Sequence, residues 1–412
     1  MIRITALHSV AALLLATANP AAPAPQEPGG DDLLTYARGV LFVSQTGLAS
    51  GSAGTALTAI DGDPYRMALM NDAQGPVEFV YKLPATTRFE RFAVPRVMEA
   101  PGNTTFVRSV VVSGSPDGPD EGFRPLAAFE LETHATEDEV TEVAADSIVP
   151  VRWVRVRFEG GILIEPGDEG RTGIRFSEIM GYGEQDPQPL STAFDGRWEL
   201  RLTERQDLKG DPFELHQDGT TITGCVGTIR FQGTVNGRVA RASGEDPATG
   251  RTGALILVAD DDGSINAAVA ANRGRFNART AVEVPDPEGC GAEPPPPPVV
   301  CGTDVYVNFE FDSAVIRPES EAVVADLHAR LVAENATRVQ VVGHTSTEGA
   351  ADYNLDLSRR RAQAVVDALV ARGFDAGRVS ADGMGETRPL ISPDDNESAR
   401  ELNRRVRVTC GG

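Results

Sequence analysis

Apolar and polar residues alternate in three different ways along the chain, which indicates three structural units. From residue 31 to about residue 185, short apolar runs are separated by Gly, Pro, Asn and Asp, a spacing typical of an all-β unit. The runs that predict strands here are residues 77–81, 88–92, 106–112, 127–131 and 151–158. The length of 412 residues also fits several domains better than one.

Residues 192–285 contain a second set of short alternating strands, such as 198–202 and 228–231. Glycines at Gly219, Gly237 and Gly263 follow Asp or Asn and supply the positive φ that tight hairpins need. We expect a small meander barrel whose interior is filled by its own side chains, serving as a spacer or interaction module.

The pattern becomes α/β in residues 304–412. Strands are expected at 305–311, 338–343, 379–383 and 404–409, and helices at 318–334 and 354–372. In the second helix the apolar residues recur at helical spacing, which leaves Arg361 at the rim of the core-facing stripe, able to lean over the preceding loop. Asn354 is the expected N-cap of this helix, and the backbone N–H groups of such a helix start favour an anion.

The N-terminal residues have the pattern of an export signal. Arg3 precedes an apolar run at 10–16 and a small-residue cleavage motif at 16–18, so residues 1–18 are expected to be a signal peptide and residues 19–30 a flexible leader. No later segment approaches the roughly 20 apolar residues of a membrane-spanning helix. The sequence therefore predicts an exported chain without a transmembrane helix.

The formal charge of −22 argues against nucleic acid or an anionic membrane surface as a partner, since both are bound by basic patches. Lysine occurs only as Lys82 and Lys209, so most cationic chemistry falls to arginine. Because the planar guanidinium suits carboxylates, carboxylate ligands are favoured.

The four cysteines are an even number in a chain expected to be exported, which favours disulfides over zinc binding. Cys290 closes the second unit and is expected to pair with Cys225. Residues 286–303 then form a linker in which five consecutive prolines predict a stiff spacer that holds the last unit away from the β units.

Residues 304–409 resemble the OmpA-like peptidoglycan-binding domain. The matching elements, in order, are Phe309-Glu310-Phe311-Asp312-Ser313, Gly343-His344-Thr345, Asn354-x-x-Leu357-Ser358-x-x-Arg361-Ala362, Gly383-Met384-Gly385-Glu386-x-x-Pro389 and Asn403-Arg404-Arg405-Val406. The resemblance implies an α/β sandwich that binds the diaminopimelate-containing stem peptide of peptidoglycan without catalysis. It also implies neighbouring antiparallel first and last strands, which would bring Cys301 and Cys410 together.

The resemblance also assigns roles to residues of the expected pocket. Arg361 would hold a ligand carboxylate, and an acid directly after Gly-His-Thr would hold its ammonium, but this chain has Ser346 there. The other pocket residues it implies are Phe311, Asp312, Thr345, Asn354 and Arg404. Either binding is retained with altered ammonium recognition, helped by Glu348 or Asp352, or the fold is kept without the ligand; we favour retained binding.

For three residues of this unit the sequence also allows a purely structural role. His344 fits a hydrogen-bonding loop residue better than a catalytic base, because no nucleophile motif accompanies it. Arg404 and Arg405 would also fit a solvated strand face.

In the first unit, residues 59–64 and 176–183 resemble the discoidin family, a galactose-binding-like jelly-roll. This resemblance implies a structural calcium ion held by Asp61, Asp63 and Glu178. The same Asp-Gly-Asp residues fit a plain turn equally well. The Gly-x-Trp opening of the second unit, ending at Trp198, weakly resembles a lipocalin.

The predicted fold class is therefore multidomain: an all-β jelly-roll, a small β-meander barrel and an α/β OmpA-like domain. The predicted function is non-enzymatic anchoring in a Gram-negative periplasm, with the chain bound to the cell wall and associated with the outer membrane. A glycan or envelope protein would bind the β units. The alternative is a carbohydrate-binding adhesion protein whose last domain is only a tether.

Overall fold

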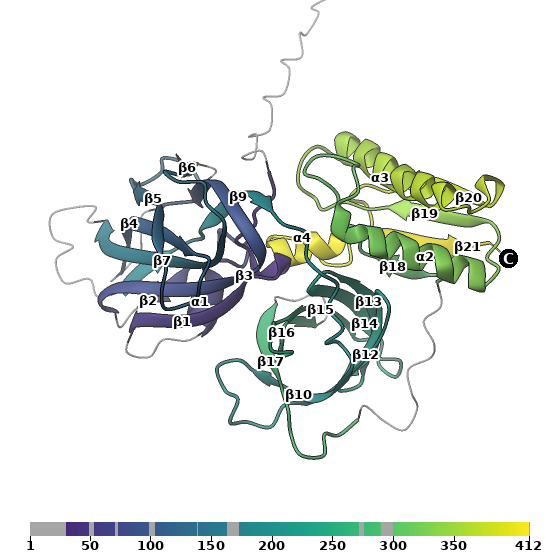
Figure 1. Ribbon diagram of the computed structural model, residues 1–412, viewed down its shortest axis with the longest axis horizontal. Coiled ribbons are helices and arrows are strands. Elements are labelled where there is room, and N and C mark those ends of the chain that lie inside the picture. The colour runs from purple at the N-terminus through teal and green to yellow at the C-terminus, as the bar shows by residue number, and fades with distance from the viewer. Residues whose placement is uncertain are drawn as a thin grey trace, which may run out of the picture.

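The computed structural model describes residues 30–48, 53–70, 73–98, 104–137, 139–162, 173–271, 276–289 and 300–411. The expected signal peptide, nearly all of the leader and the five prolines lie outside these residues. Three packed units are seen, with the first at left, the second below and the last at right in Figure 1.

The first unit is a β structure with strand order β1-β3-β7-β4-β8-β2, in which β5 pairs with β4 while β6 and β9 pair with β3. Its elements are η1 (Tyr36–Arg38), β1 (Leu41–Leu48), α1 (Ala53–Thr58), β2 (Ala68–Met70), β3 (Ala73–Pro95), β4 (Thr104–Ser115), β5 (Arg124–Glu130), β6 (Val140–Ala144), β7 (Val151–Ile162), β8 (Gly173–Phe176) and β9 (Met180–Gln185). The predicted strands 77–81 and 88–92 are two parts of β3. The first part pairs with β1 and β7 and the second with β6 and β9, with a register shift between Lys82 and Thr87.

The second unit is a closed antiparallel barrel in which consecutive strands pair and β17 returns to β10. Its strands are β10 (Gly196–Leu202), β11 (Asp211–Asp218), β12 (Thr221–Val226), β13 (Ile229–Asn236), β14 (Val239–Glu245), β15 (Thr252–Ala259), β16 (Ile265–Ala271) and β17 (Asn277–Val282). Gly219, Gly237 and Gly263 all have positive φ in the predicted turns. Buried aromatic and aliphatic side chains such as Phe213 and Leu255 pack together as one core of this unit.

The last unit has sheet order β18-β21-β19-β20, with β19 and β20 parallel. Its elements are β18 (Thr303–Val305), η2 (Pro318–Ser320), α2 (Glu321–Ala333), β19 (Val339–Gly343), α3 (Ala351–Ala371), η3 (Ala376–Arg378), β20 (Val379–Gly383), α4 (Glu397–Asn403) and β21 (Val406–Cys410). Apolar residues of α2 and α3 share one core with the sheet. The predicted fold class is confirmed for the three units.

Two local predictions in this unit are wrong, and one helix was not predicted. The first strand ends at Val305 and is followed only by a single bridge between Phe309 and Ile316. Helix α3 begins three residues before Asn354, with Ala350 at its N-cap position. Helix α4 was not expected, although Asn396 caps it by accepting a hydrogen bond from the backbone N–H of Ala399. No helix in the described ranges is both long enough and apolar enough to cross a membrane.

The predicted Cys301–Cys410 disulfide is confirmed, with the two Cα atoms 5.3 Å apart. Strands β18 and β21 are antiparallel neighbours, and Val305 lies opposite Val406. Cys225 is disulfide-bonded too, but its predicted partner Cys290 lies outside the described residues.

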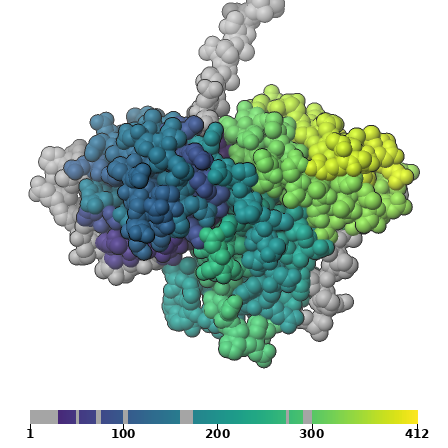
Figure 2. Space-filling model, in the orientation of Figure 1, coloured from purple at the N-terminus to yellow at the C-terminus, as the bar shows by residue number. Residues whose placement is uncertain are grey.

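The last unit is not held away from the β units, so that prediction is wrong. One apolar core contains residues of all three units, including Ile256 and Val258 on β15 of the barrel and Ala399 and Leu402 on α4. The surfaces of the units meet directly in Figure 2. These residues are fully or almost fully buried, and burial of such apolar surface favours contact between the units.

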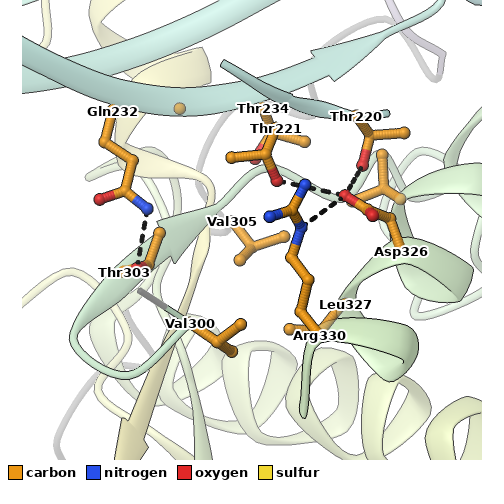
Figure 3. A pocket seen from close by; sticks show the side chains of 12 residues that line it. Thr220, Thr221, Gln232, Thr234, Val300, Thr303, Val305, Asp326, Leu327 and Arg330 are labelled. Carbon is orange, nitrogen blue, oxygen red and sulfur yellow. Dashed lines mark hydrogen bonds and ion pairs between the residues drawn. The ribbon is translucent and has the colours of Figure 1, made fainter. Parts of the chain in front are cut away.

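Polar contacts add to the boundary between the barrel and the last unit (Figure 3). The hydroxyls of Thr220 and Thr221 donate to Asp326 of α2 at 2.9 and 3.1 Å, and Arg330 donates to the same carboxylate at 3.0 Å. The side chain of Gln232 donates to Thr303 at 3.2 Å. These bonds fix how β12 and β13 lie against α2 and β18.

Candidate functional site

The residues of the expected pocket come from the loop after β19, the loop after β18, helix α3 and the end of α4. The loop after β19 is anchored by backbone bonds from His344 N–H to Arg405 O and from Thr345 N–H to Gly385 O, at 2.9 and 3.0 Å. A Cβ on Gly343 would lie 2.1 Å from the carbonyl oxygen of Ser358, so only glycine lets α3 approach the sheet this closely.

Arg361 lies against the loop after β18 rather than over the loop before α3. Its Nε donates to the carbonyl oxygen of Ser313 at 2.9 Å, and its guanidinium lies 5.1 Å from the ring centre of Phe309. Burial, with the nearby Arg404 charge, lowers the pKa of Arg361 to about 10, so it remains a cation at neutral pH. Within the described residues it forms no ion pair, although Asp31 and Glu401 favour its charged form.

Ser346 and Thr345 are both buried in the loop after β19. The Ser346 hydroxyl lies 3.4 Å from a carboxylate oxygen of Glu348. That carboxylate is in turn ion-paired with Arg400 at 2.9 Å and Arg404 at 3.5 Å. Glu348, which the Ser346 hydroxyl contacts, is therefore engaged by two arginines, while Asp352 is exposed at the start of α3.

Asn354 is buried inside the first turns of α3 and fixes the loop that precedes the helix. Its side-chain amide donates to the carbonyl oxygens of Glu348 and Ser346, at 2.8 and 3.4 Å, and to a Glu386 carboxylate oxygen at 2.7 Å. Asn354 thus shapes the pocket loop from within the helix.

Phe311 and Asp312 form the tip of the loop after β18. The Phe311 ring is 41% exposed, and Asp312 has a φ of 51°, in the left-handed region that Asp tolerates better than most residues. Asp312 accepts a hydrogen bond from the hydroxyl of Tyr353, which ties this tip to α3.

Arg404 and Arg405 are not on a solvated strand face. Arg404 follows α4 and pairs with Glu397 and with Glu401, the latter at 3.1 Å. Burial opposes its charge, but these carboxylates raise the pKa of Arg404 well above its ordinary value. Arg405 is buried and donates to Asp304 at 3.1 Å.

His344 does not act as a hydrogen-bonding loop side chain. Neither ring nitrogen has a hydrogen-bond partner in the described part of the chain. Burial, and then Arg405, Arg407 and Arg388, lower the pKa of His344 to about 3, so the imidazole is neutral at physiological pH.

The pocket continues into an ion network that reaches the other two units. Glu401 of α4 pairs with Arg38 of the first unit and Arg241 of the barrel, both at 3.2 Å. Arg38 also pairs with Asp31 at 2.9 Å, and Asp31 contacts Arg317 of the loop after β18. The sequence offered no signal for this network, because its members are far apart in the chain and belong to no shared motif.

The expected calcium residues meet at one turn of the first unit, where hydrogen bonds and an ion pair within the protein engage them. The Gly62 N–H donates to Glu178 at 2.5 Å, and Asp61 pairs with Arg66 at 3.3 Å. The backbone N–H of Asp63 donates to Asp61 at 3.0 Å. Among the described residues, no three His, Cys, Asp or Glu side chains could together hold a metal ion.

The chain was compared with known families, proteins and structures. The OmpA family matches residues 308–404. Outer membrane porin F of Pseudomonas fluorescens is 38% identical over 110 residues, 27% of this chain and 33% of that protein. The matched part thus spans about a third of this relative, and likewise 34% of outer membrane protein A of Klebsiella pneumoniae.

Among solved structures, the peptidoglycan-associated lipoprotein from Burkholderia pseudomallei is 28% identical with a TM-score of 0.24, covering 26% of this chain and 88% of that one. The family 32 CBM from Clostridium perfringens NanJ, solved with galactose, is 16% identical with a TM-score of 0.27, covering 37% of this chain and 97% of that one. This chain therefore carries an OmpA family domain at residues 308–404, the range that the family matches.

Proposed function

We propose that this protein is an exported, non-enzymatic envelope protein that binds peptidoglycan through its last unit. It would lie in the periplasm, associated with the outer membrane, and hold its β units at the cell wall. The OmpA family domain and relatives named as outer membrane proteins support this proposal. The observation that carries it is the Arg361 guanidinium, which is oriented by Ser313 and Phe309 and has no ion-pair partner in the described ranges.

Arg361 would bind a carboxylate of the stem peptide, in keeping with the expected diaminopimelate ligand. A charge-assisted hydrogen bond of this kind contributes roughly 1.5–3 kcal/mol. The bond to Ser313 and the Phe309 ring hold the guanidinium before the ligand arrives, which reduces the entropy lost on binding. Partial burial also strengthens its attraction to an anion.

Recognition of the ligand ammonium would be weaker than recognition of the carboxylate. Ser346 carries no charge, and Glu348 is paired with Arg400 and Arg404. We therefore expect Ser346→Asp to strengthen binding to diaminopimelate-containing muropeptides, since it restores a carboxylate at the position where the resemblance expects one.

Co-sedimentation of the full-length protein with purified sacculi tests the proposal. Wild type should sediment with the wall, and Arg361→Ala should remain mostly in the supernatant. Arg360→Ala is a matched control, because Arg360 neighbours Arg361 on α3 but is exposed and pairs with Asp356 at 2.8 Å. Equal and poor sedimentation of all three proteins would contradict peptidoglycan binding, and loss in both variants would contradict the role of Arg361.

A further inference from the structure

Helix α4 of the last unit rests on the acidic turn of the first unit, and it lies at the centre of the three units in Figure 1. The carbonyl oxygen of Gly62 accepts hydrogen bonds from the backbone N–H of Glu397 at 3.1 Å and from Arg400 at 3.2 Å. A Cβ on Gly62 would lie 2.1 Å from the Cβ of Glu397. The turn and the helix are therefore fitted to each other at backbone level.

The contact between α4 and the turn also brings a cationic side chain of α4 near acidic side chains of the first unit. Glu178 is fully buried beneath the turn, and its Oε2 atom has no hydrogen-bond partner in the described part of the chain. Burial, and then Asp32 and Asp61, raise the pKa of Glu178 well above its ordinary value, while Arg400 acts in the opposite direction. The guanidinium of Arg400, which contacts the turn at the carbonyl oxygen of Gly62, is thus a cation that another unit contributes near this acid.

We infer that the Asp61-Gly62-Asp63 turn, which resembles a calcium turn, is a docking surface for α4, with Arg400 supplying the positive charge that a metal would otherwise supply. The carbonyl oxygen of Gly62, an atom of the kind that calcium takes as a ligand, is already used by two donors of the last unit. The lack of a convergent metal-ligand set among the described residues agrees with this assignment.

Docking of α4 on the turn also affects the expected pocket. This consequence rests on the proposed function, whereas the docking of α4 does not depend on it. Arg400 contacts the turn through Gly62 and the pocket loop through Glu348, the latter at 2.9 Å. Arg404, one helical turn further along, holds the same carboxylate. Release of α4 from the first unit would therefore loosen one of the contacts that hold the loop carrying Ser346, which Asn354 also holds from α3.

The substitution Gly62→Ala tests docking in the full-length protein by small-angle scattering and limited proteolysis. A methyl group at this position, where φ is +75°, collides with α4, so we expect a larger radius of gyration and about tenfold faster cleavage between the units. Gly263→Ala is the matched control, because Gly263 has a φ of +85° and nothing lies within 4 Å of an added Cβ. A Gly62→Ala protein as compact and protected as this control would overturn the inference.

A second variant, Arg400→Gln, tests docking even if the Gly62→Ala protein does not fold. Arg400→Gln keeps the helix and removes the charge, so it should also loosen the last unit while circular dichroism stays unchanged. Calorimetric titration of wild type with calcium chloride should show no saturable heat. Saturable calcium binding that Glu178→Gln abolishes would refute the docking role, whatever the sacculus assay shows.

Discussion

The substitution Asp32→Asn should stabilise the protein at neutral and higher pH, by an amount that grows with pH. Asp32 accepts hydrogen bonds at one carboxylate oxygen, Oδ1, from the backbone N–H groups of Leu34 and Gly181, at 2.9 and 2.8 Å. Its other oxygen is buried without a hydrogen-bond partner in the described residues. Burial is the main cause that raises the pKa of Asp32 from 3.8 to about 7.

The direction of this pH dependence follows from proton binding by the folded and unfolded states. Between pH 4 and pH 7 the folded protein binds a proton at Asp32 that the unfolded chain does not hold, so the wild type loses stability as the pH rises through this window. At 1.36 kcal/mol for each pKa unit, the loss is about 2 kcal/mol at pH 5 and about 4 kcal/mol at pH 8. Asparagine keeps the two hydrogen bonds at Oδ1, but it buries an amide donor at a cost of about 1–3 kcal/mol. The cost of the amide cancels when two pH values are compared.

The measurement is the free energy of unfolding from urea denaturation at pH 5, 6, 7 and 8, followed by tryptophan fluorescence. Asp32→Asn should gain about 2–3 kcal/mol relative to wild type between pH 5 and pH 8. Asp120→Asn, at an exposed carboxylate of the same unit, serves as the control and should give no pH-dependent difference. A constant difference between Asp32→Asn and wild type across this range would refute the reasoning.

Three other changes test the core, the ion network and the disulfide. Leu402→Ala should lose about 2–5 kcal/mol of stability in urea denaturation, because Leu402 is completely buried where the three units meet; a loss as small as that of an exposed Leu208→Ala control would contradict this. Glu401→Gln should lose about 3–5 kcal/mol, since it leaves the buried Arg241 and the partly buried Arg38 without their shared carboxylate, and an unchanged melting temperature would oppose it. Cys410→Ser should lose about 4–5 kcal/mol, because the Cys301–Cys410 bond closes a loop of 109 residues, and reductant should then destabilise this variant less than wild type.

The periodic features of the chain could be predicted because they depend on local patterns. The alternation in residues 198–202 and the positive φ at Gly237 predict a strand and a hairpin without knowledge of the rest. The pairing of Cys301 with Cys410 followed from the fold implied by resemblance, with the two flanking strands as neighbours. In each case a few adjacent residues, or a known fold, are enough to predict the feature.

The contacts between units could not be predicted, because no local pattern records them. Ile256 and Leu255 are adjacent and equally apolar, yet one packs into the core shared by the units and the other into the core of the barrel. Arg241 looks like a polar strand residue, but it is buried between Ala37 of the first unit and Glu401 of the last. Helix α4 is short and polar, so its stability depends on packing rather than on an apolar stripe in its sequence.

Two departures from the expected patterns meet on helix α4. The pocket loop has Ser346 where an acid is expected, and its nearest acid, Glu348, binds Arg400 and Arg404. The turn of the first unit has the acids expected around a metal, but Arg400 of the same helix faces it instead. If docking requires Glu348 to pair with Arg400, the Glu348 carboxylate stabilises α4 and does not bind the ligand. Ser346→Asp then adds a second carboxylate, which could pair with Arg400 or bind the ligand ammonium. Stronger muropeptide binding together with unchanged compactness in that variant would show that the two roles are separable.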